Sequence, residues 1–259
     1  YLLAQVYEMQ PSEKTAVFKM VREIITEEQV PDLLARINGK DPVVKANLIR
    51  AVAPFERPDV QQALESTLGD DNKMVRTAAL TALSQLNGAG NVDIICSLLC
   101  DSDVDVIDKA IDVIVKMNHP DTMTHLIPAL KDENEFSRRA AVEVLNQIGT
   151  TDDIKQLLEA ISDEDWWVRA RASDALARIG GERVVNAVLE LIKDKDEDIR
   201  RSAIEILNTC KDPRAVDHLI QATGDDDWWV SERAADALSE IGDAKAVPAL
   251  LAMLKRQGR

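Results

Sequence analysis

The chain repeats itself every 31 residues. Apolar or small residues recur at this spacing along it, at Val44, Val75, Val106, Ser137, Val168, Ile199 and Val230. Two further columns keep their chemistry in the same register. One holds Leu48, Ala79, Ala110, Ala141, Ala172, Ala203 and Ala234, and the other holds Val52, Leu83, Ile114, Leu145, Leu176, Leu207 and Leu238. A period of this length is typical of proteins built from stacked copies of one small unit.

Each repeat is predicted to contain two amphipathic helices. A fourth column, at Phe55, Leu86, Met117, Ile148, Ile179, Cys210 and Ile241, completes a set at i, i+4, i+8 and i+11, which is one face of a helix. The second helix has its own apolar column, at Leu33, Leu64, Ile95, Leu126, Leu157, Val188, Leu219 and Leu250. Gly149, Gly180 and Gly242 follow the first helix of their repeats, where a helix C-terminus favours glycine.

Two short helices cannot bury their apolar faces alone, so the repeats must stack and share a core. We therefore predict an all-α fold, an α-α superhelix of about eight 31-residue hairpins that forms one solenoid over residues 1–259. In the register of the period, residues 12–25 are another first helix, and Leu2 lies one period before Leu33. The repeat pattern thus begins at a second helix. From this we expect the chain to be a piece of a longer protein with further domains.

Composition limits the partners. The formal net charge is −15, with 46 acidic against 31 basic residues, which argues against nucleic acid because binding to phosphates requires lysine and arginine. No apolar run approaches the roughly 20 residues that cross a bilayer, so we expect no membrane insertion. The three cysteines, at positions 96, 100 and 210, are too few and too irregularly spaced for a disulfide framework, which favours a reducing, cytoplasmic setting.

Acidic residues gather just before each first helix. They stand at Asp70 and Asp71, Asp101 and Asp103, Asp132 and Glu133, 163–165, 194–198 and 225–227. One interpretation is that they cap helix N-termini and complement the helix dipole. The other, compatible with the first, is an acidic edge that attracts a basic partner or divalent cations, in which case added salt would weaken partner binding steeply.

Two segments resemble a known family. They are DEDWWVRARASDALARIG at 163–180 and DDDWWVSERAADALSEIG at 225–242, and they are similar to HEAT repeats, in particular to the short bacterial and archaeal subclass named for phycobilisome lyases. The resemblance implies a right-handed solenoid with first helices on its convex side, second helices on its concave side, and protein–protein interaction as the common role. It also implies a basic ladder that bonds acids of adjoining turns, matched here by Lys45, Arg76, Arg138, Arg169 and Arg200. Ile107 and Ser231 depart from this column, so the ladder should be interrupted there.

All four tryptophans fall in two pairs, Trp166–Trp167 and Trp228–Trp229, two repeats apart. The equivalent positions elsewhere include lysine, aspartate and glutamate, which a core column does not tolerate freely. At least one ring of each pair should therefore be partly exposed at the start of its helix, where it could anchor a partner. The alternative is that the rings pack over the neighbouring turn and only stabilise the stack.

The polar columns of the second helices are the other candidate surface. They change chemistry from repeat to repeat, as expected of a face that recognises an extended partner, although plain solvated faces vary too. The candidate binding residues on this face are Lys155, Glu159, Asn186, Glu190, Asp217 and Gln221.

No catalytic or metal site emerges from the sequence, and no cofactor is expected. None of the three histidines, His119, His125 and His218, is followed by glutamate, so the His-Glu dyads that hold iron in the related HEAT enzyme deoxyhypusine hydroxylase are missing. Cys96 and Cys100 share a helix face, but Cys96 falls in an apolar column and no fourth ligand has suitable spacing. The sequence also lacks glycine-rich phosphate loops and nucleophile elbows.

Two functions therefore compete. The first, which we prefer, is a non-catalytic scaffold or regulatory segment that binds a basic or extended protein partner. The second is a subunit or segment of a lyase or chaperone-like enzyme of the phycobilisome-lyase type, which would hold a tetrapyrrole and its acceptor protein. The scaffold predicts a protein partner and no spectral change with bilins, and the lyase predicts the reverse.

Overall fold

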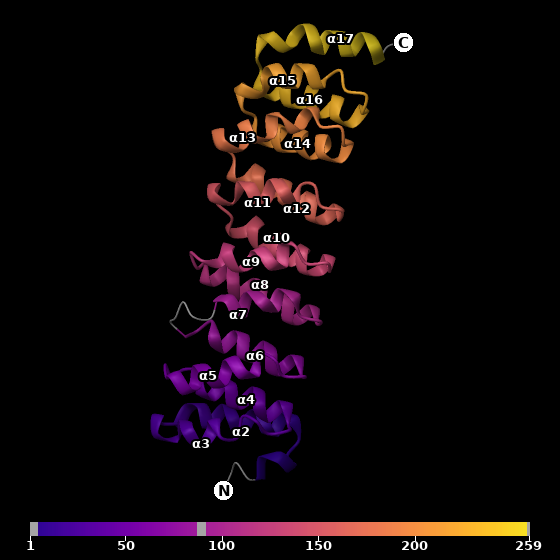
Figure 1. Ribbon diagram of the computed structural model, residues 1–259. Helices are drawn as coiled ribbons and strands as arrows, with labels where there is room; N and C mark the ends of the chain where they lie inside the picture. The colour runs from indigo at the N-terminus through magenta and orange to yellow at the C-terminus, as the bar shows by residue number, and fades with distance from the viewer. Residues whose placement is uncertain (1–4, 87–91, 258–259) are drawn as a thin grey trace. The chain divides into compact units, whose positions relative to one another are not determined.

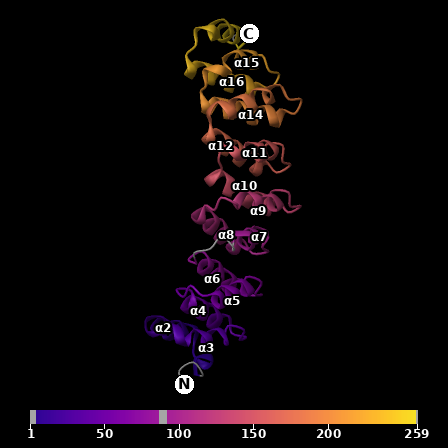
Figure 2. The ribbon, with the colours of Figure 1, turned by 60° about the vertical axis from the view of Figure 1, so that its left-hand side comes forward.

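The computed structural model describes residues 5–86 and 92–257, and the regular elements in these ranges are all helical (Figure 1, Figure 2). By their contacts the residues form two compact units, Tyr1–Ala140 and Ala141–Arg259. Within these ranges no helix has the length and hydropathy needed to cross a membrane.

The first unit contains four first helices that pack side by side in sequence order. They are α2 (Pro11–Ile24), α4 (Pro42–Val52), α6 (Lys73–Leu83) and α8 (Val104–Met117). The second helices of this unit are shorter: α3 (Val30–Leu34), α5 (Pro58–Thr67), α7 (Val92–Ser97) and α9 (Thr122–Leu130). Helix α4 packs between α2 and α6, and α6 packs on α8, as the indigo-to-magenta part of Figure 1 shows.

The second unit repeats the arrangement. Its first helices are α12 (Trp166–Ile179), α14 (Glu197–Cys210) and α16 (Trp228–Ile241), and α10 (Glu135–Ile148) crosses the boundary between the units. Its second helices are α11 (Ile154–Ala160), α13 (Gly181–Leu189), α15 (Val216–Ala222) and α17 (Val247–Gln257). Helix α14 packs between α12 and α16, and α11, α13 and α15 each pack on the first helix that follows them. Within each unit the hairpins therefore stack as an α-solenoid, and the predicted fold class is confirmed.

Short 3-10 turns lead into or out of the second helices. They are η2 (Glu27–Gln29), η4 (Leu98–Cys100), η5 (Thr151–Asp153), η6 (Leu191–Lys193), η7 (Pro213–Ala215) and η8 (Ala244–Ala246), and a further turn, η1 (Val6–Glu8), precedes α2. These turns shorten the α-helical part of the second helices, because two helices and two loops must fit within the 31 residues of one repeat.

The central columns of the period form the core. All seven side chains of the column from Leu48 to Ala234 are fully buried, and the column from Val52 to Leu238 is at most 2% exposed. Six alanines in the first of these columns let neighbouring first helices approach closely. The outer column, from Phe55 to Ile241, is only half-buried, because it lies at the C-terminal end of each first helix, where the stack opens to solvent.

The acidic runs cap helices, as the first interpretation of them predicted. The side chains that accept a backbone N–H at the start of a first helix are Asp41, Asn72, Asp103, Asn134, Asp165, Asp196 and Asp227. In every such loop except that of Asp41, an acid two residues earlier accepts the backbone N–H of the capping residue, for example Asp225 from Asp227 at 2.8 Å. Each of these loops thus uses one carboxylate to shape the turn and the side-chain oxygen of an aspartate or asparagine to satisfy a helix N-terminus.

The first helices end in a column of left-handed residues. Gly180 and Gly242 have positive φ, as their position in the sequence predicted, and so do Asn118 and Lys211 at the equivalent positions. Gly149 stands in the same column without a positive φ, but a Cβ there would lie 2.4 Å from the Leu145 carbonyl oxygen. Glycine is therefore required at this position for close approach rather than for handedness.

The basic ladder joins consecutive repeats. Arg76 donates Nε and Nη2 to the carboxylate of Asp101 at 2.9 and 2.8 Å, while its Nη1 donates to the carbonyl oxygens of Asp70 and Asp71 in its own loop. Lys45 reaches Asp70 in the same way, at 2.5 Å. Ser231 instead donates to the Thr223 carbonyl oxygen at 3.0 Å, and the alkyl side chain of Ile107 is buried, so neither position continues the ladder.

Candidate functional site

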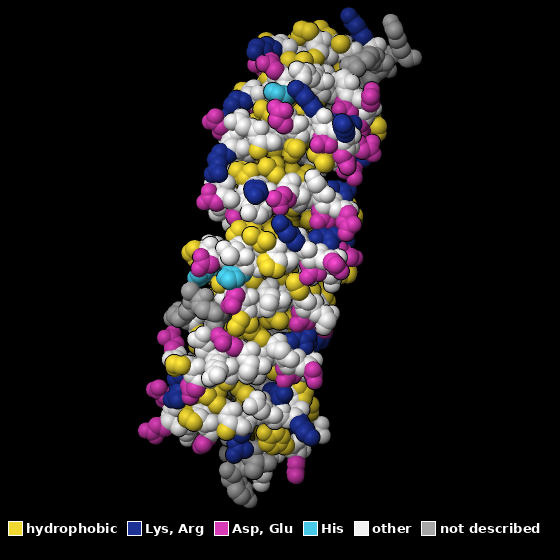
Figure 3. All heavy atoms as spheres, viewed as in Figure 1, with side chains coloured by type: hydrophobic (Ala, Val, Ile, Leu, Met, Phe, Trp, Pro, Cys, Tyr) yellow, Lys and Arg dark blue, Asp and Glu magenta, His cyan; other side chains and the backbone are white. Residues whose placement is uncertain are grey.

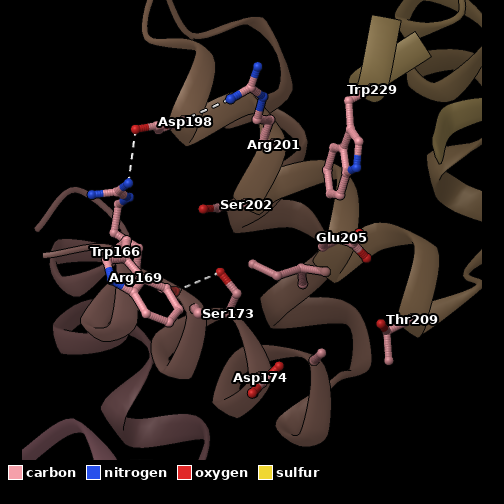
Figure 4. Close-up of a pocket in the computed structure, with 13 residues that line it drawn as sticks. Trp166, Arg169, Ser173, Asp174, Asp198, Arg201, Ser202, Glu205, Thr209 and Trp229 are labelled. Atoms are coloured by element: carbon pink, nitrogen blue, oxygen red, sulfur yellow. Dashed lines mark hydrogen bonds and ion pairs between the residues drawn. The ribbon is translucent and has the colours of Figure 1, made fainter. Parts of the chain in front are cut away.

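A groove crosses the first-helix face of the second unit. It has a volume of about 300 Å³ and is formed by α12 and α14, with Trp229 of α16 at its far side. Trp166 borders it on α12, and Asp198, Arg201 and Glu205 line it on α14, as Figure 4 shows. We call this cavity the tryptophan groove.

Helix capping places the tryptophans. Asp165 accepts the backbone N–H groups of Trp167 and Val168 at 3.0 and 3.1 Å, so Trp166 becomes the first residue of α12. Asp227 caps α16 through Trp229 N–H at 2.9 Å, which puts Trp228 in the equivalent position. The side chain of this first residue is largely exposed in both helices.

The first tryptophan of each pair is exposed, as predicted. Trp166 is 65% exposed and Trp228 is 67% exposed. A Trp ring buries a large area when a partner covers it, and such rings are frequent binding hot spots. Trp166 borders the tryptophan groove, whereas Trp228 lies outside it.

The second tryptophan of each pair is half-buried and packs against an arginine. The Arg171 guanidinium lies 5.1 Å from the centre of the Trp167 ring, and Arg233 lies 5.3 Å from that of Trp229. These arginines also bond to acids of the preceding repeat, since Arg233 Nε is 3.1 Å from Glu205 Oε1. The second ring of each pair therefore stabilises the stack, and Trp229 in addition forms one wall of the groove.

The charges along the groove are already compensated. Asp198 lies between two guanidinium groups, 2.9 Å from Arg169 Nη2 and 3.6 Å from Arg201 Nη1 (Figure 4). Arg201 Nε donates to Asp227 at 2.6 Å. Burial alone would raise the pKa of Asp227, but the hydrogen bonds from Arg201 and from Trp229 N–H outweigh it, so the pKa lies below its ordinary value. The Asp227 hydrogen bond also raises the pKa of Arg201.

The three cysteines lie outside the tryptophan groove. Burial raises the pKa of the Cys96 thiol to about 12, and burial also raises the pKa of Cys100 and of Cys210. A thiol acts as a nucleophile when its pKa is lowered, so these three are poor candidates. Within the described ranges, no three histidine, cysteine or acidic side chains are grouped so as to hold a metal ion.

The six predicted residues of the second helices lie on a different surface. All six are exposed, on α11 (Lys155, Glu159), on α13 and the turn directly after it (Asn186, Glu190) and on α15 (Asp217, Gln221). None of them lines the tryptophan groove. Gln221 borders a separate cavity of about 370 Å³ with His218 and Arg200, and Asp217 lies 3.9 Å from Lys245.

The sequence pointed to Arg169 through the basic ladder and to Asp198 through the acidic run at 194–198, but not to Arg201 or to the groove that they line. Asp198 occupies the column of Trp167 and Trp229, so an acid between two aromatic positions was the available signal. Its two arginine partners come from different repeats, and only packing brings them together.

The repeats match those of a known protein family. The family model described as HEAT repeats matches residues 30–109, 92–177, 125–204, 154–226 and 186–258. The chain belongs to the HEAT-repeat family. A search of curated proteins found no match.

Solved structures share the fold at low sequence identity. A mutant of Kap121p superposes with a TM-score of 0.70 at 13% identity, covering 95% of this chain and 34% of that one. Kap95p, in a structure that concerns its binding to RanGDP, gives 0.61 at 17% identity, covering 93% and 39%. The chain thus spans well under half of either relative. Human deoxyhypusine hydroxylase gives 0.42 at 16% identity, covering 90% and 91%. At these identities the likeness to the two Kap proteins shows the fold alone.

Proposed function

We propose that the chain is a non-catalytic protein-interaction scaffold and that the tryptophan groove is its principal binding surface. The observation that supports this most directly is Trp166, a large ring 65% exposed at the edge of a groove whose neighbouring charges are mutually paired. A partner can cover this ring without leaving a charge unpaired, which is the condition for a favourable buried anchor.

The partner is a protein segment that is basic or extended. Acidic residues outnumber basic ones by 46 to 31, and Figure 3 shows acidic and basic side chains interspersed over the face in view. Mixed charge of this kind favours a peptide with its own polar groups over a phosphate backbone. The six exposed residues of α11, α13 with the turn after it, and α15 belong to the same proposal, as a second surface for an extended partner.

Three further parts of the proposal rest on the sequence. They are membership of the phycobilisome-lyase-like bacterial and archaeal subclass, a cytoplasmic location, and a place as one continuous solenoid within a longer, multidomain protein. The tetrapyrrole-lyase alternative is favoured by no particular residue of the described ranges, and we do not propose it.

The experiment uses two exposed tryptophans as a matched pair. The whole chain is immobilised, a captured partner is identified, and its dissociation constant is measured for the wild type, Trp166→Ala and Trp228→Ala. We expect Trp166→Ala to weaken binding at least tenfold, by about 1.4 kcal/mol or more, and Trp228→Ala to leave it within a factor of two. Equal effects of the two variants would show that the groove is not the binding surface.

A further inference from the structure

A second cavity, on the first-helix face of the first unit, is lined by basic side chains. Its volume is about 450 Å³. Arg22 reaches it from α2, Arg50 from α4 and Lys109 from α8, and Thr81 and Gln85 line the side formed by α6 and the turn after it. This concentration of positive charge stands out in a chain whose net charge is −15.

The repeat register shows how unusual Arg50 is. Its column reads Lys19, Arg50, Thr81, Asp112, Glu143, Asp174, Glu205 and Asp236. The last five members are all acids, whereas the first two are bases. The sign of this position therefore reverses along the chain, and Arg50 and Thr81 stand where the later repeats hold a carboxylate.

The later repeats show what that carboxylate does. Glu143 accepts Arg171 at 3.2 Å and Glu205 accepts Arg233 at 3.1 Å, each pair separated by 28 residues. The equivalent pair in the first unit is Thr81 and Lys109. A hydroxyl thus replaces the carboxylate, and Lys109 lacks the acid that its counterparts have.

The cavity lining holds one acid against the three bases. Among the residues that the structure describes, Arg22, Arg50 and Lys109 form no ion pair within 4.0 Å. Asp105 also lines the cavity, but its carboxylate accepts Lys73 Nζ at 2.5 Å. Partial burial and, second, the positive charge of Arg22 lower the pKa of Arg50, as expected when two guanidinium groups approach without an anion between them.

We propose that this cavity binds the phosphate group of a phosphate monoester through Arg22, Arg50 and Lys109. Guanidinium groups bond phosphate oxygens in bidentate geometry, and a monoester carries about −1.5 to −2 charges at pH 7, which matches the uncompensated charge of the cavity. The monoester is either a free small molecule or a phosphorylated side chain of a partner. Nucleic acid fits less well, because the rest of the chain repels a long run of phosphates.

Isothermal titration calorimetry on the whole chain tests the proposal, with inorganic phosphate, free phosphoserine and a phosphoserine peptide as probes at constant ionic strength. We expect saturable binding of phosphoserine that weakens at least tenfold in Arg22→Gln and Arg50→Gln. Arg36→Gln is the matched control, since Arg36 is an exposed arginine of the same unit that does not line the cavity. Tighter binding of the peptide than of free phosphoserine would identify a protein partner as the source, and equal binding would identify a small molecule.

A second variant keeps the proposal testable if the arginine variants fold poorly. Thr81→Glu restores the carboxylate that Glu143 and Glu205 supply in the later repeats, so it should pair with Lys109 and weaken phosphoserine binding at least tenfold without lowering the melting temperature. Absence of saturable binding of every probe, equal loss in Arg36→Gln, or full affinity in Thr81→Glu would overturn the proposal.

Discussion

Arg200 and Asp225 form a bidentate ion pair across two repeats. Arg200 Nε donates to Asp225 Oδ2 at 3.0 Å, and Nη2 donates to Oδ1 at 3.2 Å. The remaining Nη1 donates to the carbonyl oxygens of Asp194 and Lys195, at 2.9 and 3.2 Å. One guanidinium group therefore joins the loop of its own repeat to the loop of the next, and both partners are largely shielded from solvent.

We expect Arg200→Ala to lower the free energy of unfolding by about 2–4 kcal/mol, because it leaves Asp225 and two loop carbonyls without their donor. Arg200→Lys should recover only part of this loss, since an ammonium group cannot make the bidentate contact. Urea denaturation followed by circular dichroism measures the effect. Arg183→Ala removes a largely exposed pair with Asp152 and should cost less than about 0.5 kcal/mol. Similar losses in Arg200→Ala and Arg183→Ala would contradict the stabilising role of the Arg200–Asp225 pair.

Acid should destabilise the first unit through Asp70. Burial alone would raise the pKa of Asp70, but the hydrogen bonds from Lys45 and Asn72 N–H and the charges of Lys45 and Arg76 lower it. Because the native pKa lies below that of the unfolded chain, this stability is present above the unfolded pKa and is lost as the pH falls through the native one. Asp41 follows the same rule through Lys14.

The melting temperature should therefore fall below about pH 5. Asp70→Asn keeps an oxygen for the Asn72 N–H but removes the charge, so it should flatten this acid dependence while lowering stability at pH 7. Glu28→Gln, at an exposed position without an ion pair in the described structure, should leave the profile unchanged. A profile equally steep in Asp70→Asn would contradict the prediction.

The alanine column should not tolerate larger residues. Ala172 is fully buried on α12, which packs against α14. Ala172→Leu adds three carbons where the helices meet, and we expect it to cost about 1–3 kcal/mol. Ala170→Leu, on the exposed side of the same helix, should change stability by less than about 0.5 kcal/mol. Chemical denaturation of the two variants in parallel measures both free energies of unfolding, and equal losses would contradict the prediction.

Lys211 is a site for stabilisation. It has φ of 50° at the C-terminus of α14, a conformation that costs a non-glycine residue about 1 kcal/mol. Lys211→Gly should therefore raise the free energy of unfolding by roughly this amount, although it removes an exposed ion pair with Glu240. Lys211→Ala loses the ion pair and keeps the strained backbone. A higher free energy of unfolding in that variant would therefore show that relief of backbone strain is not the cause of the stabilisation.

The two members of a tryptophan pair should separate in stability measurements. Trp167 is half-buried beneath Arg171, and Trp167→Ala should cost about 2–3 kcal/mol through lost packing and cation–π contact. Trp166 is exposed, and Trp166→Ala should cost less than about 1 kcal/mol. Equal losses by differential scanning calorimetry would mean that Trp166 is structural too.

Much of the fold follows from the period. The fully buried column from Leu48 to Ala234, the capping role of the acids and the forward contacts of Arg76 and Arg200 all recur at one spacing, so a single sequence is enough to predict them. The positive φ of Lys211 could also be predicted from the period. Its residue type gave no hint, but Gly180 and Gly242 occupy the same column.

The candidate site was predictable only in part. The polar residues in the tryptophan columns predicted that at least one ring of each pair is exposed, and Trp166 and Trp228 are. They did not predict the groove, because it depends on side chains of three helices and on the contact of Asp198 with Arg169 of the preceding repeat. The ladder itself shifts here: Arg169 bonds Asp198 rather than Asp194, which stands where Asp101 and Asp225 stand. Local packing decides which acid a given arginine bonds, and the residue types at one repeat position do not predict it.

The direction of the ladder has a consequence for fragments of this protein. Each of its pairs joins a base to an acid in the repeat that follows, as Arg76 joins Asp101 and Arg200 joins Asp225. A cut between α6 and α7 would therefore leave Arg76 bare on the face of the N-terminal piece and Asp101 bare on the face of the C-terminal piece. The two pieces would attract each other, and each would repel a second copy placed face to face with it. Split halves of the molecule should accordingly reassemble in the original order.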